Sequence, residues 1–286
     1  MNVLFNLMIL CLLSIPSLAD QKLVISGSST LLDLSRELKP TFEKVSGKQI
    51  VLTGSGSTEG YEDLLSGKAS IARMSRPLYS EELRSAKNKD ILLKPFQIGL
   101  DSICIIANKK SIPKSSSKID KQELVSLYFS KEGKVKNLLS SHHTGALTIF
   151  SGPKESGTVA FFKNHLGKKN DEFSPTVKTV KTSKMVLEAV GKQQNSLGFV
   201  SLADLRTKPD LERNITVLNY GNKKEFASNC NSKNSADRTY DFTRQLYFVL
   251  KIPLQKAESK IIQFLLSEDG QKVIKDKNLI PVGALN

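Results

Sequence analysis

The chain contains few of the side chains that build metal and redox sites. Its 286 residues include only three histidines and three cysteines. We expect His142, His143 and His165 on loops or on a helix surface, with a zinc site as the weaker alternative. Because neither the number nor the spacing of these residues indicates a metal site, no cofactor is expected.

Sequence motifs of the common enzyme classes are also missing. The chain has no Gly-x-Ser-x-Gly element, no Walker sequence and no dinucleotide fingerprint. Ser111-Ile-Pro-Lys114 and Ser115-Ser-Ser-Lys118 match the Ser-x-x-Lys element of penicillin-binding enzymes, but the Ser-Asp-Asn and Lys-Thr-Gly partner motifs are absent. A nucleophilic serine also needs a base within reach. We therefore predict that the protein is not an enzyme.

Long apolar runs occur only at the N-terminus. Residues 1–19 carry no charged side chain, contain the apolar run Leu7–Leu13 and end in Ser17-Leu18-Ala19. This layout is typical of a secretory signal that is cut after Ala19, with a retained N-terminal anchor as the alternative. No later segment approaches the roughly 20 apolar residues of a membrane helix. We therefore expect residues 20–286 to form a soluble periplasmic protein.

The two cysteines beyond the predicted signal are Cys104 and Cys230. An oxidising compartment would permit a disulfide between them. Cys104 lies inside the apolar run Ile103–Ala107, which favours a buried free thiol. The sequence therefore predicts a free Cys104 and leaves the disulfide as the alternative.

The formal net charge of +14 favours anionic partners. Lysine pairs such as Lys109-Lys110, Lys168-Lys169 and Lys223-Lys224 are scattered and are not interleaved with aromatic residues. Nucleic acid is a poor partner for an exported chain with this pattern. A small anion remains as a partner, and a solvated basic surface is the simpler interpretation of the lysines.

Short β-type runs alternate with helical ones along the chain. The predicted strands cover 22–26, 49–53, 69–73, 98–108, 146–151, 197–201, 215–218 and 246–250. Predicted helices cover 31–45, 61–65, 159–166, 184–190 and, as one continuous helix, 256–275. Ser29 or Thr30 should cap the first helix and Gly47 should end it, while Pro40 should bend or break it. This order predicts an α/β fold with parallel strands and crossover helices.

Three clusters of glycine, serine and threonine each stand between a predicted strand and a predicted helix. They are Gly27-Ser28-Ser29-Thr30, Gly54-Ser55-Gly56-Ser57-Thr58 and Ser156-Gly157-Thr158. A helix N-terminus exposes unpaired N–H groups and a partial positive charge, and small hydroxyl residues add donors. Any one cluster is more often a plain helix cap. Three of them at the carboxyl ends of strands predict one small-anion site between the two halves of the chain.

At these clusters the chain resembles the periplasmic phosphate-binding proteins of ABC transporters, in the type II solute-binding superfamily. No single motif is specific, but the matches extend over nearly all of residues 20–286. The matching segments are Ser26–Leu32, Gly54–Leu78 with its terminal Ser75-Arg76-Pro77-Leu78, Ser156-Gly157-Thr158 with Phe161-Phe162, Leu197–Leu202, Phe264–Gln271 and Ile280-Pro281-Val282.

The resemblance implies a two-lobed, periplasmic-binding-protein-like (type II) α/β fold. Each lobe would be a mixed, mainly parallel sheet flanked by helices, and two hinge strands would join the lobes. Residues 20–107 and 245–286 would form lobe I, and residues 108–244 would form lobe II. The lobes would close on one phosphate ion. The implied ligand residues are Ser29, Thr30, Leu31 through its backbone, Ser57, Ser75, Ser156, Gly157 and Thr158.

Two positions depart from the family pattern. The family has an aspartate where Ser75 stands, which accepts the proton of hydrogen phosphate and repels sulfate, and an arginine where Gly152 stands. We hypothesise that Arg76 supplies the missing positive charge as a two-pronged donor, with Lys154 as the other candidate. The alternative for Arg76 is a surface or lobe–lobe salt bridge. Discrimination against sulfate therefore stays open.

The resemblance also implies a function and a partner. The protein would capture inorganic phosphate as a monomer and deliver it to the membrane permease of an ABC transporter. One alternative is a receptor of the same fold for sulfate or a phosphorylated compound. Another is an exported interaction protein whose cleft has degenerated.

Overall fold

The computed structural model describes residues 22–54, 56–111, 118–130, 147–207, 210, 213–222, 225–228, 230–237 and 239–282. The predicted signal sequence and the residues His142 and His143 lie outside these ranges. The strands are β1 (Lys22–Gly27), β2 (Gln49–Leu52), β3 (Ile71–Met74), β4 (Leu92–Asn108), β5 (Lys118–Ile119), β6 (Thr148–Ser151), β7 (Val177–Thr179), β8 (Ser196–Ser201), β9 (Ile215–Val217), β10 (Asn219–Asn222), β11 (Glu225–Ser228), β12 (Thr243–Ile252) and β13 (Ile280–Pro281).

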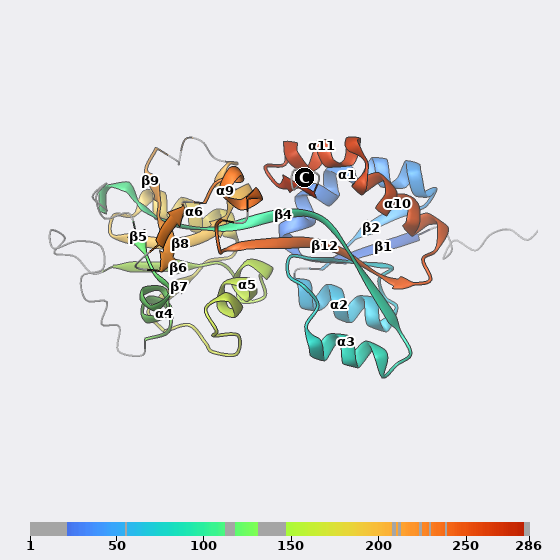
Figure 1. Cartoon of the computed structure of the whole chain (residues 1–286), viewed down its shortest axis with the longest axis horizontal. Helices are drawn as coiled ribbons and strands as arrows, with labels where there is room; N and C mark the ends of the chain where they lie inside the picture. The colour runs from blue at the N-terminus through green and yellow to red at the C-terminus, as the bar shows by residue number, and fades with distance from the viewer. Residues whose placement is uncertain are drawn as a thin grey trace, which may run out of the picture.

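The helices cover both faces of the main sheet (Figure 1). The 3-10 helices are η2 (Ser29–Leu31) and η3 (Lys109–Ser111). The α-helices are α1 (Leu32–Ser46), α2 (Ser57–Ser66), α3 (Ser80–Lys87), α4 (Lys121–Phe129), α5 (Gly157–His165), α6 (Ser183–Lys192), α7 (Leu202–Leu205), α9 (Ser232–Ala236), α10 (Lys256–Leu266) and α11 (Glu268–Asp276). Among the described residues, no helix is both long enough and apolar enough to cross a membrane.

The main sheet runs through both halves of the molecule. Its strand order is β2-β1-β3-β12-β4-β8-β6-β7, with β9 and β13 paired to β4. Strand β1 is parallel to β2 and β3, and β6 is parallel to β7 and β8, as the alternation of strands and helices predicts. In contrast, β12 lies antiparallel between β3 and β4, and β4 lies antiparallel to β8. The sheet is therefore mixed.

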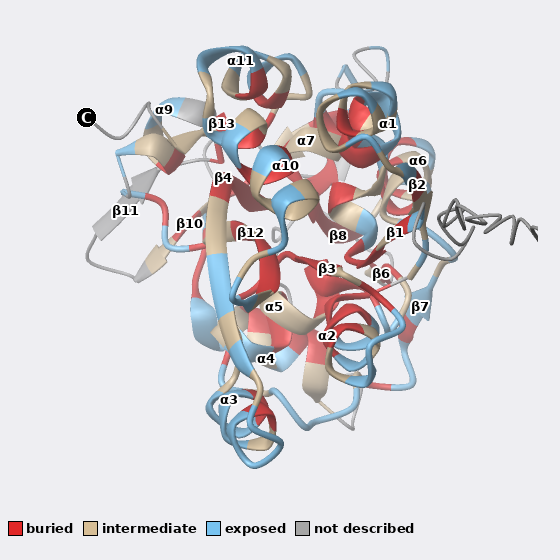
Figure 2. Cartoon of the chain, turned by 90° about the vertical axis from the view of Figure 1, so that its right-hand side faces the viewer, coloured by how far each residue is buried: buried red, intermediate tan, exposed pale blue. Residues whose placement is uncertain are grey.

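Two large hydrophobic cores divide the molecule into two lobes, and a smaller cluster around Tyr61, Leu64 and Met74 belongs to the first lobe. The core of the first lobe combines residues 23–98 with residues 246–279, and the core of the second lobe uses residues 100–242 together with Ile280. Buried residues follow the central strands, and exposed residues lie on the outer faces of the helices (Figure 2). Strands β4 and β12 run side by side between the lobes (Figure 1), so they are the hinge strands.

The ends of two helices differ from the sequence predictions. Ser29 and Thr30 do not cap α1; they form η2, and α1 begins at Leu32 without a side-chain capping bond. Pro40 lies inside α1 without breaking it, because it is on the exposed side, where water can satisfy the freed carbonyl group. Gly47 ends α1 in the left-handed conformation, as predicted (φ 69°).

The predicted helix over 256–275 is two helices, α10 and α11. Ser267 ends the first and caps the second, because its hydroxyl accepts a hydrogen bond from the Gly270 N–H at 3.3 Å. A serine at such a position stabilises a helix start more than a helix interior. The apolar periodicity continues across Ser267, so periodicity alone does not separate the two helices.

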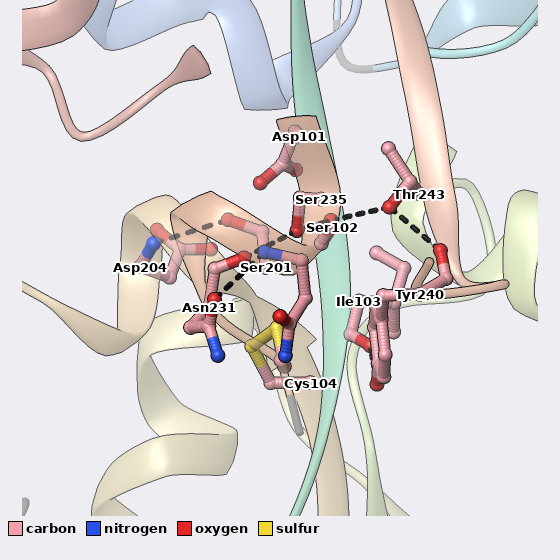
Figure 3. The surroundings of a disulfide bond; sticks show 12 residues. Asp101, Ser102, Ile103, Cys104, Ser201, Asp204, Asn231, Ser235, Tyr240 and Thr243 are labelled. Atoms are coloured by element: carbon pink, nitrogen blue, oxygen red, sulfur yellow. Dashed lines mark hydrogen bonds between the residues drawn. A yellow bond between two sulfur atoms is a disulfide. The ribbon is translucent and has the colours of Figure 1, made fainter. Parts of the chain in front are cut away.

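The prediction of a free thiol at Cys104 is wrong. Cys104 of β4 forms a disulfide with Cys230, which precedes α9, and both are buried (Figure 3). Next to the disulfide, the Ser102 hydroxyl donates to Ser235 Oγ of α9 at 2.6 Å. The apolar neighbours of Cys104 indicated burial correctly but carried no information about a partner 126 residues away. The disulfide fastens α9 to a hinge strand.

Candidate functional site

The three glycine-serine-threonine clusters lie at turns where strands meet helices. The first follows β1 and forms η2, the second follows β2 and opens α2, and the third follows β6 and opens α5. The first two belong to one lobe and the third to the other. The arrangement agrees with the rule that ligands of open α/β sheets bind at the carboxyl ends of strands.

The second and third clusters touch across the lobes. An added Cβ at Gly157 would lie 2.0 Å from Ser75 Oγ and 3.2 Å from Ser57 Oγ. Ser57 and Ser75 are themselves linked, because the Ser57 hydroxyl accepts from the Ser75 N–H at 3.1 Å. A Cβ at Gly56 would lie 2.4 Å from the Glu155 carbonyl oxygen. Only glycine permits this approach, so the structure is a closed arrangement of the lobes.

A buried arginine connects the first and third clusters. Nη2 of Arg244, on hinge strand β12, donates to Thr30 Oγ1 at 3.2 Å and to Thr158 Oγ1 at 3.0 Å. The same arginine forms an ion pair with Asp101 of β4, through Nε at 3.1 Å and Nη2 at 2.8 Å to Oδ2. Neither residue was among the predicted ligands. Their signal was one charged residue in the buried part of each strand, although each strand also carries a lysine nearer its outer end (Lys94 and Lys251).

Other predicted ligand residues lie around this centre. Ser156 is buried and caps α5, with its hydroxyl accepting from the Thr158 N–H at 3.1 Å. The Leu31 N–H, which the resemblance assigned to the ligand, donates to the Ser28 carbonyl at 3.2 Å. Ser29 is exposed at the edge of the site.

Arg76 has a role other than the hypothesised one. Its guanidinium forms a two-pronged ion pair with Glu82, through Nη1 to Oε2 at 2.8 Å and Nη2 to Oε1 at 2.7 Å. It also lies 3.9 Å from the centre of the Tyr79 ring. All three residues belong to the first lobe, so this is a buried ion pair within one lobe and not a surface or lobe–lobe bridge. Glu82 holds both terminal nitrogens, and Nη2 also donates to Thr58 Oγ1 of the second cluster at 3.1 Å, so both prongs of Arg76 are bonded to protein groups.

Lys154 does not supply the missing positive charge either. Its ammonium group pairs with Glu172 Oε1 at 2.7 Å, and both side chains are about two-thirds exposed (67% and 68%). The hydrogen bond to Glu172 raises the pKa of Lys154. Gly152, which stands where the family has an arginine, contacts Ser183 and Val159. The cation that joins the first and third clusters across the lobes is Arg244.

A cavity of about 930 Å³ opens beside the clusters, between the lobes. Its wall includes Ser29, Thr30 and Ser156, and also the half-buried Asp204 at the start of α7. Burial, and then the nearby charge of Asp101, raise the pKa of Asp204 to about 6. The cavity thus has polar groups of both signs and borders on the candidate site.

Two partly exposed ion pairs join the lobes at the outer edge of the contact between them. Lys184 Nζ of α6 lies 2.9 Å from Asp33 Oδ2 of α1, and this hydrogen bond holds the pKa of Asp33 below its usual value. Lys169 Nζ lies 2.5 Å from Glu81 Oε1 of α3. All four side chains are partly exposed, so each pair stabilises the closed arrangement only modestly.

The chemistry available here is binding rather than covalent catalysis. Hydroxyls, helix-start amides and the guanidinium of Arg244 gather at a place from which water is largely excluded. Within the described part of the chain, the hydrogen bonds of Ser57 and Ser75 join them to each other and to no carboxylate or imidazole. Nor do three or more histidine, cysteine or acidic side chains in that part form a group able to hold a metal ion.

His165, the described histidine, lies at the end of α5, as expected for a helix residue. It is half-buried against Tyr220, with Nε2 3.2 Å from the phenol oxygen. Burial lowers the pKa of His165 to about 4, so the ring is neutral at physiological pH. It packs in the second core, away from the three clusters.

Comparisons with known proteins agree with this arrangement. A model of the PBP superfamily domain matches residues 15–269. The phosphate-binding protein PstS of Staphylococcus aureus is 23% identical over 251 residues, covering 86% of this chain and 74% of the relative.

Two solved structures share the fold. An ABC-type phosphate transport receptor from Vibrio cholerae superposes with a TM-score of 0.74 at 21% identity, covering 90% of this chain and 99% of the receptor. A substrate-binding protein from Clostridium perfringens with bound phosphate has a TM-score of 0.73 at 22% identity, covering 91% of this chain and 99% of that protein.

Proposed function

Because the chain belongs to the PBP (periplasmic-binding-protein) superfamily, we propose that it captures inorganic phosphate between its lobes for an ABC transporter. The observation that carries the proposal is the meeting of the three clusters in one closed, buried place. Thr30 from one lobe and Thr158 from the other bond the same guanidinium nitrogen, while Gly157 rests against Ser57 and Ser75. Donors of this kind suit the oxygens of one small anion.

The proposed ligand residues follow from this geometry. We assign the anion to the hydroxyls of Thr30, Ser57, Ser75 and Thr158, and to amide groups at the start of α5 (Ser156 and Gly157). Leu31 and the exposed Ser29 would contribute only after a small rearrangement of η2, because the Leu31 N–H is already bonded within the turn. Arg76 is left out because its fork is held by Glu82.

The remaining features of the function are also proposals. The protein would act in the periplasm after removal of residues 1–19, as a monomer that docks on a membrane permease. Lobe I would comprise 20–107 and 245–286, and lobe II 108–244; the side chains of β4 from Leu100 onward pack in the second core, which favours a crossing nearer residue 100. The lobes would open and close about β4 and β12 as hinged bodies.

A melting experiment tests the proposed function directly. Phosphate-stripped protein, residues 20–286, is heated with inorganic phosphate, with sulfate or with neither. A ligand that binds only the folded protein raises the midpoint by mass action. A rise with phosphate supports the proposal, and an unchanged midpoint at millimolar phosphate would overturn it.

The cavity beside the clusters favours a second candidate, a receptor for a phosphorylated compound. Thr30 and Ser156 lie in its wall, so a phosphate group held at the clusters could carry a larger body that extends into the 930 Å³ space. Competition separates the two candidates. A phosphate monoester that displaces inorganic phosphate at lower concentration than phosphate itself would support the second candidate, and failure to compete would exclude it.

A further inference from the structure

Two opposite charges lie at the centre of the hinge. Asp101 of β4 and Arg244 of β12 are register partners on neighbouring antiparallel strands. Their side chains are fully buried, at 0% exposure each. Charges withdrawn from water in this way need a full set of hydrogen-bond partners.

The pair leaves two buried atoms without a partner. Nε and Nη2 of Arg244 both donate to one carboxylate oxygen, Oδ2 of Asp101. In the described structure, Nη1 of Arg244 and Oδ1 of Asp101 have no hydrogen-bond partner. In the Arg76–Glu82 pair of the first lobe both carboxylate oxygens are bonded, and only Nε of Arg76 has no partner among the described residues. The hinge pair thus retains one donor and one acceptor.

Arg244 also sets the direction of two hydroxyl groups. Thr30 and Thr158 use their oxygens to accept from Nη2, at 3.2 and 3.0 Å. An O–H whose oxygen accepts from a cation must direct its own proton elsewhere. Among the described residues neither hydroxyl proton has an acceptor, so both are available to an anion held between the lobes.

The hinge pair has the charges that are missing at the positions of the family's ligand residues. Ser75 and Gly152 are neutral, whereas Asp101 and Arg244 carry one charge of each sign, and Arg244 bonds the first and third clusters. The charge of Asp101 also acts nearby, because it contributes to the raised pKa of Asp204.

We propose that Asp101 and Arg244 form the charged part of the anion site and select a protonated oxyanion. Nη1 of Arg244 donates to an oxygen of the anion, and Oδ1 of Asp101 accepts the proton of its O–H group. Hydrogen phosphate and dihydrogen phosphate carry such a proton, whereas sulfate at neutral pH does not. An unprotonated oxygen would face a carboxylate oxygen, and this repulsion rejects sulfate. The inference rests on the proposed phosphate function.

The first test uses the unaltered protein, residues 20–286, and four probes. Isothermal titration calorimetry at neutral pH compares phosphate and arsenate, which are protonated, with sulfate and selenate, which are not. We expect the protonated pair to bind at least about 100-fold more tightly, as for sites in which a mismatched ligand leaves a buried polar group unpaired. Sulfate binding within about tenfold of phosphate would overturn the inference while leaving oxyanion capture intact. Binding of none of the four would overturn the proposed function together with the inference.

The second test uses Asp101→Asn, which replaces an acceptor by an amide that can also donate. Phosphate affinity should fall and sulfate affinity should rise, so that their ratio shrinks by at least about tenfold. A purely structural role of Asp101 would lower both affinities together. Glu82→Gln is the matched control, because it removes one charge of the other buried ion pair and should leave the ratio unchanged.

Arg244→Lys completes the set. It retains the charge but has no Nη1, so phosphate affinity should fall by about tenfold or more. Unchanged phosphate-to-sulfate ratios in Asp101→Asn, or full phosphate affinity in Arg244→Lys, would show that the pair only holds the hinge strands together. Circular dichroism checks that each variant is folded, and the four-anion comparison stands on its own if a variant is not.

Discussion

A methyl group at Gly157 should block closure of the lobes without harming the fold. The added Cβ would lie 2.0 Å from Ser75 Oγ and 3.2 Å from Ser57 Oγ, and both of those atoms belong to the opposite lobe. Carbon and oxygen atoms do not approach to 2 Å, so the lobes must separate or the serines must rotate. Overpacking of this kind costs about 1–3 kcal/mol. Since the contact exists only in the closed form, the cost appears as roughly 5- to 150-fold weaker phosphate binding.

The measurement pairs calorimetry with melting of the ligand-free protein. Alanine is favoured over glycine in a helix, and Gly157 is the first residue of α5, so the ligand-free midpoint should stay the same or rise slightly. Gly152→Ala is the matched control from the same loop, because its Cβ would lie no closer than 3.6 Å to any neighbour. If Gly157→Ala binds phosphate within about twofold of the unaltered protein, the closed contact is not the binding-competent form.

Three further outcomes are expected. Replacing Cys104 and Cys230 together with alanine should lower the free energy of unfolding by roughly 5 kcal/mol, because the disulfide closes a loop of 126 residues; urea unfolding measures this, and a variant as stable as the oxidised protein would contradict it. Lys184→Gln removes the interlobe ion pair with Asp33 and should speed phosphate release about two- to fivefold in stopped-flow experiments. An unchanged release rate would show that this pair does not stabilise the closed arrangement. Because burial raises the pKa of Asp204 to about 6, the folded protein holds this proton more tightly than the unfolded chain does, and the free energy of unfolding should fall as the pH rises from 3.8 to about 6; Asp204→Asn should remove that part of the pH dependence, and identical slopes would argue against it.

The fold was predictable to the extent that its signals are local. Apolar runs and their spacing locate β1, β2, β3 and β4. The alternation with helices predicts the parallel pairing of β1 with β2 and β3, which the register confirms, whereas β4 is antiparallel to its neighbours. The split between α10 and α11 depends on a single capping serine within a continuous apolar pattern. One capping residue is a weaker sequence signal than a continuous apolar periodicity. In the folded chain, however, the cap decides where α10 ends and α11 begins.

In the candidate site, too, the features with local sequence signals were predictable and the long-range contacts were not. The three clusters were identifiable because glycine and hydroxyl residues before a helix have a local physical meaning. The pairings of Arg244 with Asp101 and of Cys104 with Cys230 join residues 143 and 126 positions apart, so only the folded chain reveals them. Arg76 shows the reverse error. Its place beside Ser75 in the sequence suggested an anion-binding residue, but its guanidinium forms an ion pair with Glu82, six residues further on.

The two crossings of the hinge also have a consequence for the order in which the chain can fold. The second core uses one uninterrupted stretch, residues 100–242 apart from Ile280, and its disulfide closes within that stretch. The part of the main sheet that belongs to the first lobe is incomplete until β12 takes its place between β3 and β4. A chain that emerges N-terminus first can therefore assemble and oxidise its later lobe before its earlier one. The lobe that begins the sequence is the last to be finished.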